Sequence, residues 1–113
     1  MIKIVILNSL RNEIFKKFKR DSGKVYSLVR GLKDNPRKGK ILGQVGKISI
    51  RELRHKGFRF YYLIDGNKLD LFDKEKAKEL LIKFVRMSKK NDQQRTINKI
   101  KLILKRIGFD EIE

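Results

Sequence analysis

Residues 47–72 read K-I-S-I-R-E-L-R-H-K-G-F-R-F-Y-Y-L-I-D-G-N-K-L-D-L-F and contain the clearest strand signals of the chain. Ile48 and Ile50 alternate with polar residues, which is typical of a half-buried strand. Residues 58–64 are mostly aromatic and aliphatic and predict a central strand. His55-Lys56-Gly57 is expected to form the turn between them. Because so short a connection permits only antiparallel pairing, the stretch predicts a β-hairpin.

The chain after this hairpin predicts more strands and a charged insertion. Asp65-Gly66-Asn67 fits a second tight turn, because Asp and Gly tolerate the positive φ values of a type I′ turn. Residues 68–72 alternate polar and apolar and are expected to return as a strand. The highly charged residues 73–79 are interpreted as an insertion, helical or mobile, and residues 80–87 as another strand.

The chain before the hairpin predicts a strand and two helices. Residues 1–7 are aliphatic and β-branched and fit a short buried strand. Asn8-Ser9 offers an N-cap, and the residues that follow are apolar at helical spacing: Leu10, Ile14 and Phe18. After the break at 21–23, a second amphipathic helix is expected to end at Asn35-Pro36, because proline disfavours the α region at the preceding residue. Residues 37–46 are interpreted as a loop running into a strand.

A last amphipathic helix is predicted from Asn91 or Asp92 to Gly108, with a buried stripe of Ile97, Ile100, Leu104 and Ile107. The whole pattern indicates an α+β fold in one domain, residues 1–113. We expect the N-terminal strand and helical hairpin to pack on a twisted antiparallel sheet, with a C-terminal helix.

The charge of the chain points to its partners. Thirty Lys and Arg residues against thirteen Asp and Glu residues give a formal net charge of +17. Such an imbalance favours nucleic acid as the partner, ahead of an acidic protein or a membrane surface. With no cysteine and a single histidine, we expect no metal site and no cofactor. No apolar run reaches the roughly 18 residues of a membrane span, so we expect a cytoplasmic protein without membrane contact.

The catalytic motifs of phosphate-binding loops, dinucleotide-binding folds, serine hydrolases and zinc proteases are absent from the sequence. Basic residues instead concentrate in two segments, 37–59 and 86–90. Because strand ends that are distant in sequence can meet on one face of an antiparallel sheet, the two segments are candidates for one groove.

Three stretches carry a family resemblance: K-D-N-P-R-K-G-K-I-L-G (33–43), I-R-E-L-R-H-K-G-F-R-F-Y-Y-L-I-D-G-N (50–67) and F-V-R-M-S-K-K (84–90). Together they resemble the RelE/ParE toxin superfamily, and the last stretch, with the basic helix after it, is most similar to the HigB-type branch. The resemblance covers nearly the whole chain in the expected order. It implies a toxin of a type II toxin–antitoxin system, a metal-independent endoribonuclease that cleaves mRNA on the translating ribosome. The implied partners are the ribosome, mRNA and a cognate antitoxin.

The resemblance also implies the site residues. Arg59 takes the strand arginine of the family motif and is assigned to the phosphate and the transition state; Arg86 and Lys89 complete the predicted catalytic set. Arginine suits this task because its planar fork binds phosphate oxygens bidentately. The remaining basic residues are predicted to bind the RNA backbone: Arg37, Lys38, Lys40, Arg51, Arg54, Lys56 and Lys90.

Several alternatives stay open at this point. Arg51 and Arg54 fall on opposite faces of their strand, so at most one faces the groove. One of Tyr61 and Tyr62 is expected in the core and the other free to stack on a base, while His55 is interpreted as an exposed turn residue. The chain has no tyrosine after Tyr62, whereas classical RelE nucleases end with one. The other functions to be weighed are a ParE-like inhibitor of DNA gyrase and a catalytically inactive basic module that binds nucleic acid or a partner protein.

Overall fold

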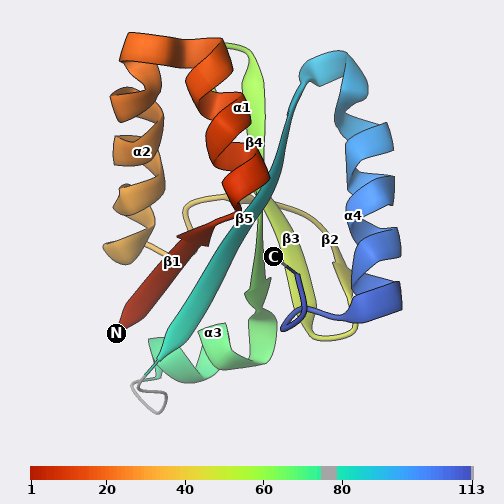
Figure 1. The fold of residues 1–113 in the computed structure, drawn as a ribbon. Coiled ribbons are helices and arrows are strands. Elements are labelled where there is room, and N and C mark those ends of the chain that lie inside the picture. Colours follow the sequence, from red (N-terminus) through yellow and green to blue (C-terminus); the bar gives the residue numbers. More distant parts are fainter. Residues whose placement is uncertain (75–78, 113) are drawn as a thin grey trace.

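The computed structural model describes residues 1–74 and 79–112, which form a five-stranded sheet with helices on both faces (Figure 1). The strands lie in the order β1-β5-β4-β3-β2. Their bounds are β1 Ile2–Ile6, β2 Lys40–Val45, β3 Ile48–His55, β4 Phe58–Asp65 and β5 Leu80–Lys89. The helices are α1 Asn8–Phe18, α2 Ser22–Arg30, α3 Gly66–Asp73 and α4 Gln93–Ile107.

The predicted hairpin of β3 and β4 is confirmed and forms the middle of the sheet. Its ladder runs from Ile48 opposite Asp65 to His55 opposite Phe58. Lys56 and Gly57 connect the strands with φ values of 49° and 81°. Both values lie in the left-handed region that a two-residue hairpin turn requires, which is why a glycine is useful there.

The predictions of a second hairpin turn at 65–67 and of a returning strand at 68–72 are wrong, because Asp65 begins helix α3 over Gly66–Asp73 instead. Its Oδ1 accepts hydrogen bonds from the backbone N–H groups of Asn67 at 3.0 Å and Lys68 at 3.1 Å, so Asp65 is the N-cap of α3. Leu69 is buried on the inner side of this helix. Of the expected insertion at 73–79, residues 75–78 lie outside the described residues.

The sheet is mixed, whereas an antiparallel sheet was expected. β2, β3, β4 and β5 pair antiparallel, but β1 pairs parallel with β5, from Ile2 opposite Leu80 to Ile6 opposite Phe84. The two strands are far apart in sequence, so no short turn constrains their direction. The predicted fold class, α+β with an N-terminal helical hairpin and a C-terminal helix, is confirmed.

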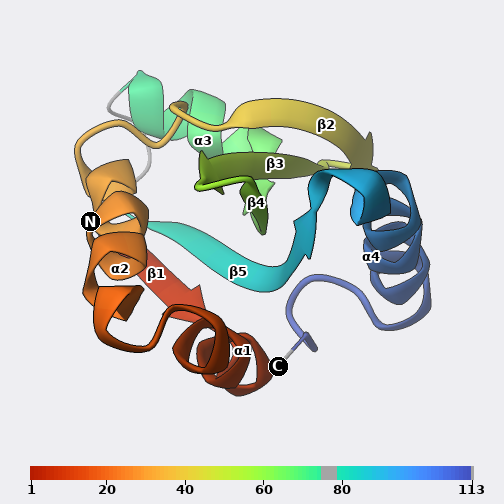
Figure 2. The same cartoon turned by 90° about the horizontal axis from the view of Figure 1, so that it is seen from above.

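Helices cover the two faces of the sheet separately (Figure 2). On one face, Phe18 of α1 packs against Phe60 with ring centroids 5.9 Å apart, and Tyr62 packs against Phe84 at 4.9 Å. On the other face, α4 buries Ile97, Ile100 and Leu104, as its apolar stripe predicts. Ile107, the last member of that predicted stripe, is 51% exposed because the helix ends there and the chain turns at Gly108.

A buried lysine fixes the chain after α4. Lys83 of β5 is 7% exposed, and its Nζ donates to the carbonyl oxygens of Phe109 at 2.7 Å, Asp110 at 3.3 Å and Ile112 at 3.2 Å. Ile112 is buried as a result.

Among residues 1–74 and 79–112, no helix has the length and apolar character needed to cross a membrane.

Candidate functional site

Polar side chains form two adjacent rows across the α4 side of the sheet. Directly paired residues of an antiparallel ladder present their side chains on the same face. The first row is Arg54, Arg59 and Ser88, on β3, β4 and β5. The second row, one step further along the strands, is Lys40, Glu52, Tyr61 and Arg86, on β2 to β5. The sheet thus gathers four cationic residues around one carboxylate.

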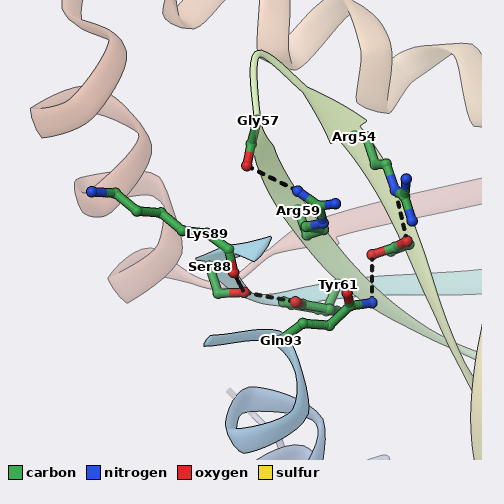
Figure 3. A network of polar contacts seen from close by, with 8 residues as sticks. Arg54, Gly57, Arg59, Tyr61, Ser88, Lys89 and Gln93 are labelled. Carbon is green, nitrogen blue, oxygen red and sulfur yellow. Dashed lines mark hydrogen bonds and ion pairs between the residues drawn. The ribbon is translucent and has the colours of Figure 1, made fainter. Parts of the chain in front are cut away.

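Glu52 is the only carboxylate of these rows, and its side chain is fully buried and engaged on both oxygens. Oε1 accepts from Arg54 Nε at 2.9 Å, and Oε2 accepts from Gln93 Nε2 at 3.1 Å (Figure 3). Arg54 is held by its Nε while its side chain stays 54% exposed. Gln93 is the first residue of α4, so Glu52 also ties the start of this helix to β3.

Arg59 is the unusual member of the site because it is buried without a counter-ion. It is 6% exposed, and its Nη1 donates to the Gly57 carbonyl at 3.0 Å (Figure 3). Its Nε is buried and has no hydrogen-bond partner, and no carboxylate of the described residues pairs with it. A buried charge is costly unless it is paired. The surroundings of Arg59 are therefore those of an anion-binding group.

Two hydroxyl groups lie directly beside this arginine. Tyr61 Oη and Ser88 Oγ are 2.6 Å apart, and Ser88 Oγ donates to the Lys89 carbonyl at 3.0 Å (Figure 3). Because a serine hydroxyl has one proton, Tyr61 is the donor in the first of these bonds. Burial raises the pKa of Tyr61, and the nearby carboxylate of Glu52 acts in the same direction, against the Ser88 bond and the Arg59 and Arg54 charges. The phenol is neutral at physiological pH.

Arg86 extends the site toward α4. It is diagonal to Arg59 in the ladder, since Arg59 pairs with Ser88, and its Nη1 donates to the Val85 carbonyl at 2.9 Å. Arg86 also lines an apolar cavity of about 300 Å³ between β5 and α4, otherwise formed by Leu7, Leu63, Val85, Ile100, Ile103, Ile107 and Ile112. Arg86 is partly buried beside these apolar side chains, so its charge is screened less than that of a fully exposed arginine.

The structure does not bring Arg51 to this site. Arg51 is buried on the opposite face of β3, where its Nε donates to Ser49 Oγ at 3.1 Å and its Nη1 to the Gly39 carbonyl at 3.2 Å. Tyr62 Oη accepts from the Gly39 N–H at 3.1 Å. Arg51 thus holds the segment before β2 in place, and Arg54 is the member of the pair that faces the site.

The other predicted residues fall into two further places. Arg37 pairs with Asp70 of α3 at 2.6 Å, and α3 follows the end of β4, whereas Arg59 is the second residue of that strand. Lys38 follows Arg37 in the same exposed segment. Three lysines surround Phe58 at the hairpin end of the sheet: Lys56, Lys89 and Lys90. Lys89 was predicted to act with Arg59, but its side chain extends away from it (Figure 3).

The aromatic residues differ from their predicted roles. Tyr61 and Tyr62 are both fully buried, so the prediction that one is free to stack on a base is wrong. Both rings are enclosed because helices cover both faces of the sheet. His55 is half-buried against Phe18, with ring centroids 5.7 Å apart, and it is not the exposed turn residue that was expected.

Sequence reasoning missed Ser88 and Gln93, which complete the hydrogen-bond network. Neither has a motif around it: Ser88 is brought opposite Arg59 by the pairing of β4 with β5, two strands that are joined through α3 and not by a tight turn. Gln93 is brought in only by the packing of α4.

Within the described parts of the chain, no group of three or more His, Cys, Asp or Glu residues is placed to hold a metal ion. Comparison of the chain with family models, curated proteins and solved structures found no match.

Proposed function

We propose that this protein is a toxin of the RelE/HigB type, an endoribonuclease that cleaves mRNA on translating ribosomes in the cytoplasm. A cognate antitoxin would keep it inactive. The proposal joins the three-stretch resemblance to the α+β fold and to the arginines on the α4 side of the sheet. The observation that carries it is the buried guanidinium of Arg59, with which no carboxylate of residues 1–74 and 79–112 pairs.

The chemistry needs such a guanidinium. RNA is cleaved without a metal when its 2′-oxygen attacks the adjacent phosphorus and the 5′-oxygen leaves, which gives a 2′,3′-cyclic phosphate and a 5′-hydroxyl end. Negative charge gathers on the phosphoryl oxygens in the transition state, where fixed positive charges stabilise it. Arg59 supplies this charge from a partly dehydrated position, and Arg86, diagonal to it, supplies a second. Arg54, Lys40 and the lysines near Phe58 bind the flanking backbone.

The proton transfers are assigned to solvent and to the substrate itself. Glu52 is engaged by Arg54 and Gln93, and His55 lies on the other face of the sheet. Tyr61 is enclosed, and its hydroxyl is engaged in the hydrogen bond with Ser88. Electrostatic stabilisation by arginine is thus the main contribution of the described residues to the rate.

A second function, an RNA-binding module without cleavage, is favoured by one observation. The carboxylate of Glu52 stands where classical RelE nucleases have lysine, and both its oxygens are occupied. Such a module would keep the salt-dependent attachment to RNA that many lysines and arginines give. A ParE-like inhibitor of gyrase remains as a third function, recognised by DNA breaks instead of RNA ends.

Inducible expression with mapping of RNA 5′ ends separates these functions. The proposal predicts growth arrest with new 5′-hydroxyl ends inside coding regions, and their loss when translation is blocked beforehand. Arg59→Ala should remove both effects, while Arg95→Ala, at an exposed arginine of α4 paired with Asp92, should leave them. Growth arrest with DNA breaks and intact mRNA would overturn the proposal in favour of gyrase, and arrest with neither would favour the binding module.

A further inference from the structure

Phe58 separates two open hollows at the hairpin end of the sheet. The first, about 340 Å³, is lined by Glu13, Lys16, Lys17, Phe58, Met87 and Ser88. The second, about 610 Å³, is lined by Lys56, Gly57, Phe58, Lys89, Lys90 and Asn91. Residues from α1, from the hairpin turn and from the end of β5 thus meet around one half-buried aromatic ring.

The charge around this ring is strongly positive. Five lysines line the two hollows against one carboxylate, that of Glu13. Lys56 is 3.7 Å from a carboxylate oxygen of Asp21, and both side chains are about half exposed. Exposed pairs of this kind are weak, so Lys56 remains able to bind another anion. A groove with spaced cations and an aromatic floor is typical of sites that bind single-stranded nucleic acid.

The ring of Phe58 is supported from inside. Phe18 packs edge-on against it with centroids 5.4 Å apart. Lys17 Nζ lies over the ring, 5.0 Å from its centroid. An exposed ammonium over a ring is worth a factor of about 2 to 5 in an equilibrium, and a stacked base a factor of about 5 to 150. A base can therefore displace Lys17, whose ammonium then binds the phosphate beside it.

We propose that Phe58 is the floor of a nucleobase subsite for single-stranded RNA, with the lysines of the two hollows holding the flanking phosphates. This inference rests on the proposed function, since it takes RNA as the ligand of the Arg59 site. The two sites adjoin through Ser88, which lines the first hollow and accepts the hydrogen bond of Tyr61 beside Arg59. Because Phe58 and Arg59 point to opposite faces of β4, the RNA strand would pass around the hairpin end of the sheet between the base on Phe58 and the cleaved bond.

The chain contains no tryptophan, so one introduced indole reports on this ring alone. Phe58→Trp should bind a 2′-O-methyl RNA oligonucleotide, which cannot be cleaved, with saturable quenching of its fluorescence. An abasic nucleotide at one position should remove the quenching and weaken binding about 5- to 150-fold. Phe15→Trp is the matched control, because Phe15 is 65% exposed on α1 and lines neither hollow.

The result that overturns the inference is RNA binding, seen by anisotropy, without a change in the Phe58→Trp emission. Equal quenching by poly-glutamate would also overturn it, since the groove would then accept any acidic polymer. If Phe58→Trp does not fold, the affinity of the wild-type protein is measured for oligonucleotides with an abasic nucleotide at each position in turn. Weaker binding at one position supports the subsite, and equal binding at all positions contradicts it. None of these readouts needs cleavage. If RNA quenches the Phe58→Trp fluorescence but the protein does not cleave mRNA in cells, the nuclease proposal is wrong and the base subsite stands. If Arg59-dependent cleavage occurs without this quenching, the base subsite is wrong and the nuclease proposal stands.

Discussion

Arg54 and Arg59 lie directly opposite each other in the β3–β4 ladder, yet within the described part of the chain a carboxylate pairs with Arg54 and none with Arg59. Like charges in directly opposed positions destabilise a sheet. Glu52 neutralises Arg54 from the same strand, whereas Arg59 has only the Gly57 carbonyl and a buried Nε without a partner. The charge of Arg59 is therefore uncompensated on the α4 face of the sheet, and the charge of a phosphate would compensate it.

Gly39→Ala should destabilise the protein by about 1–3 kcal/mol, the usual cost of overpacking. A Cβ at this position would lie 2.2 Å from Tyr62 Oη, and the Tyr62 ring is fully buried and cannot move aside. The melting temperature should fall by about 4–12 °C. Gly23→Ala is the control, because nothing lies within 4 Å of its added Cβ. Equal melting temperatures for the two variants would contradict this account of the segment before β2.

Lys83→Met should loosen the chain after α4. The substitution removes the common donor of three backbone carbonyls, so residues 109–112 lose their link to β5 while the core keeps an apolar side chain. Hydrogen exchange in this segment should accelerate at least tenfold, measured by mass spectrometry. Lys99→Met, at an exposed position of α4, should leave the exchange unchanged. Unaltered exchange in Lys83→Met would contradict this role of Lys83.

Alkaline pH should destabilise the fold through its buried phenols. Burial raises the pKa of Tyr61 and of Tyr62 above the usual 10.0, so the unfolded chain loses these protons first as pH rises. The stability that the neutral phenols provide is complete below about pH 10 and is lost as pH rises above it. Melting temperatures between pH 8 and 11 should fall less steeply in Tyr61→Phe/Tyr62→Phe than in Tyr26→Phe. The same slope in both variants would contradict the assignment.

The fold was largely predictable because most of its signals are local. Lys56-Gly57 fixes the register of β3 and β4, and the period-2 pattern separates Arg51 from Arg54. The hairpin turn at Asp65-Gly66 was predicted wrongly because aspartate is common both in turns and at helix N-caps. The helix forms here because it buries Leu69, which the local sequence does not show.

The site was less predictable, because its details depend on packing between distant segments. Arg59 and Arg86 share a face by strand register alone. Which of Arg51 and Arg54 faces α4, however, depends on where the helices pack on the sheet. Lys17 reaches Phe58 only because α1 crosses the hairpin end of the sheet, which no local pattern encodes.

Single-turnover cleavage of mRNA on programmed ribosomes tests the role of Arg59 most directly. The proteins to compare are the wild type, Arg59→Ala, Arg59→Lys and Arg95→Ala. If Arg59 stabilises the transition-state phosphoryl charge, Arg59→Ala should lose at least about 100-fold in rate, or about 2.7 kcal/mol. Arg59→Lys should recover only part of it, because lysine lacks the bidentate fork, and Arg95→Ala should cleave normally. Thermal melting confirms that each variant is folded. A folded Arg59→Ala that cleaves at the wild-type rate would show that Arg59 does not stabilise the transition state.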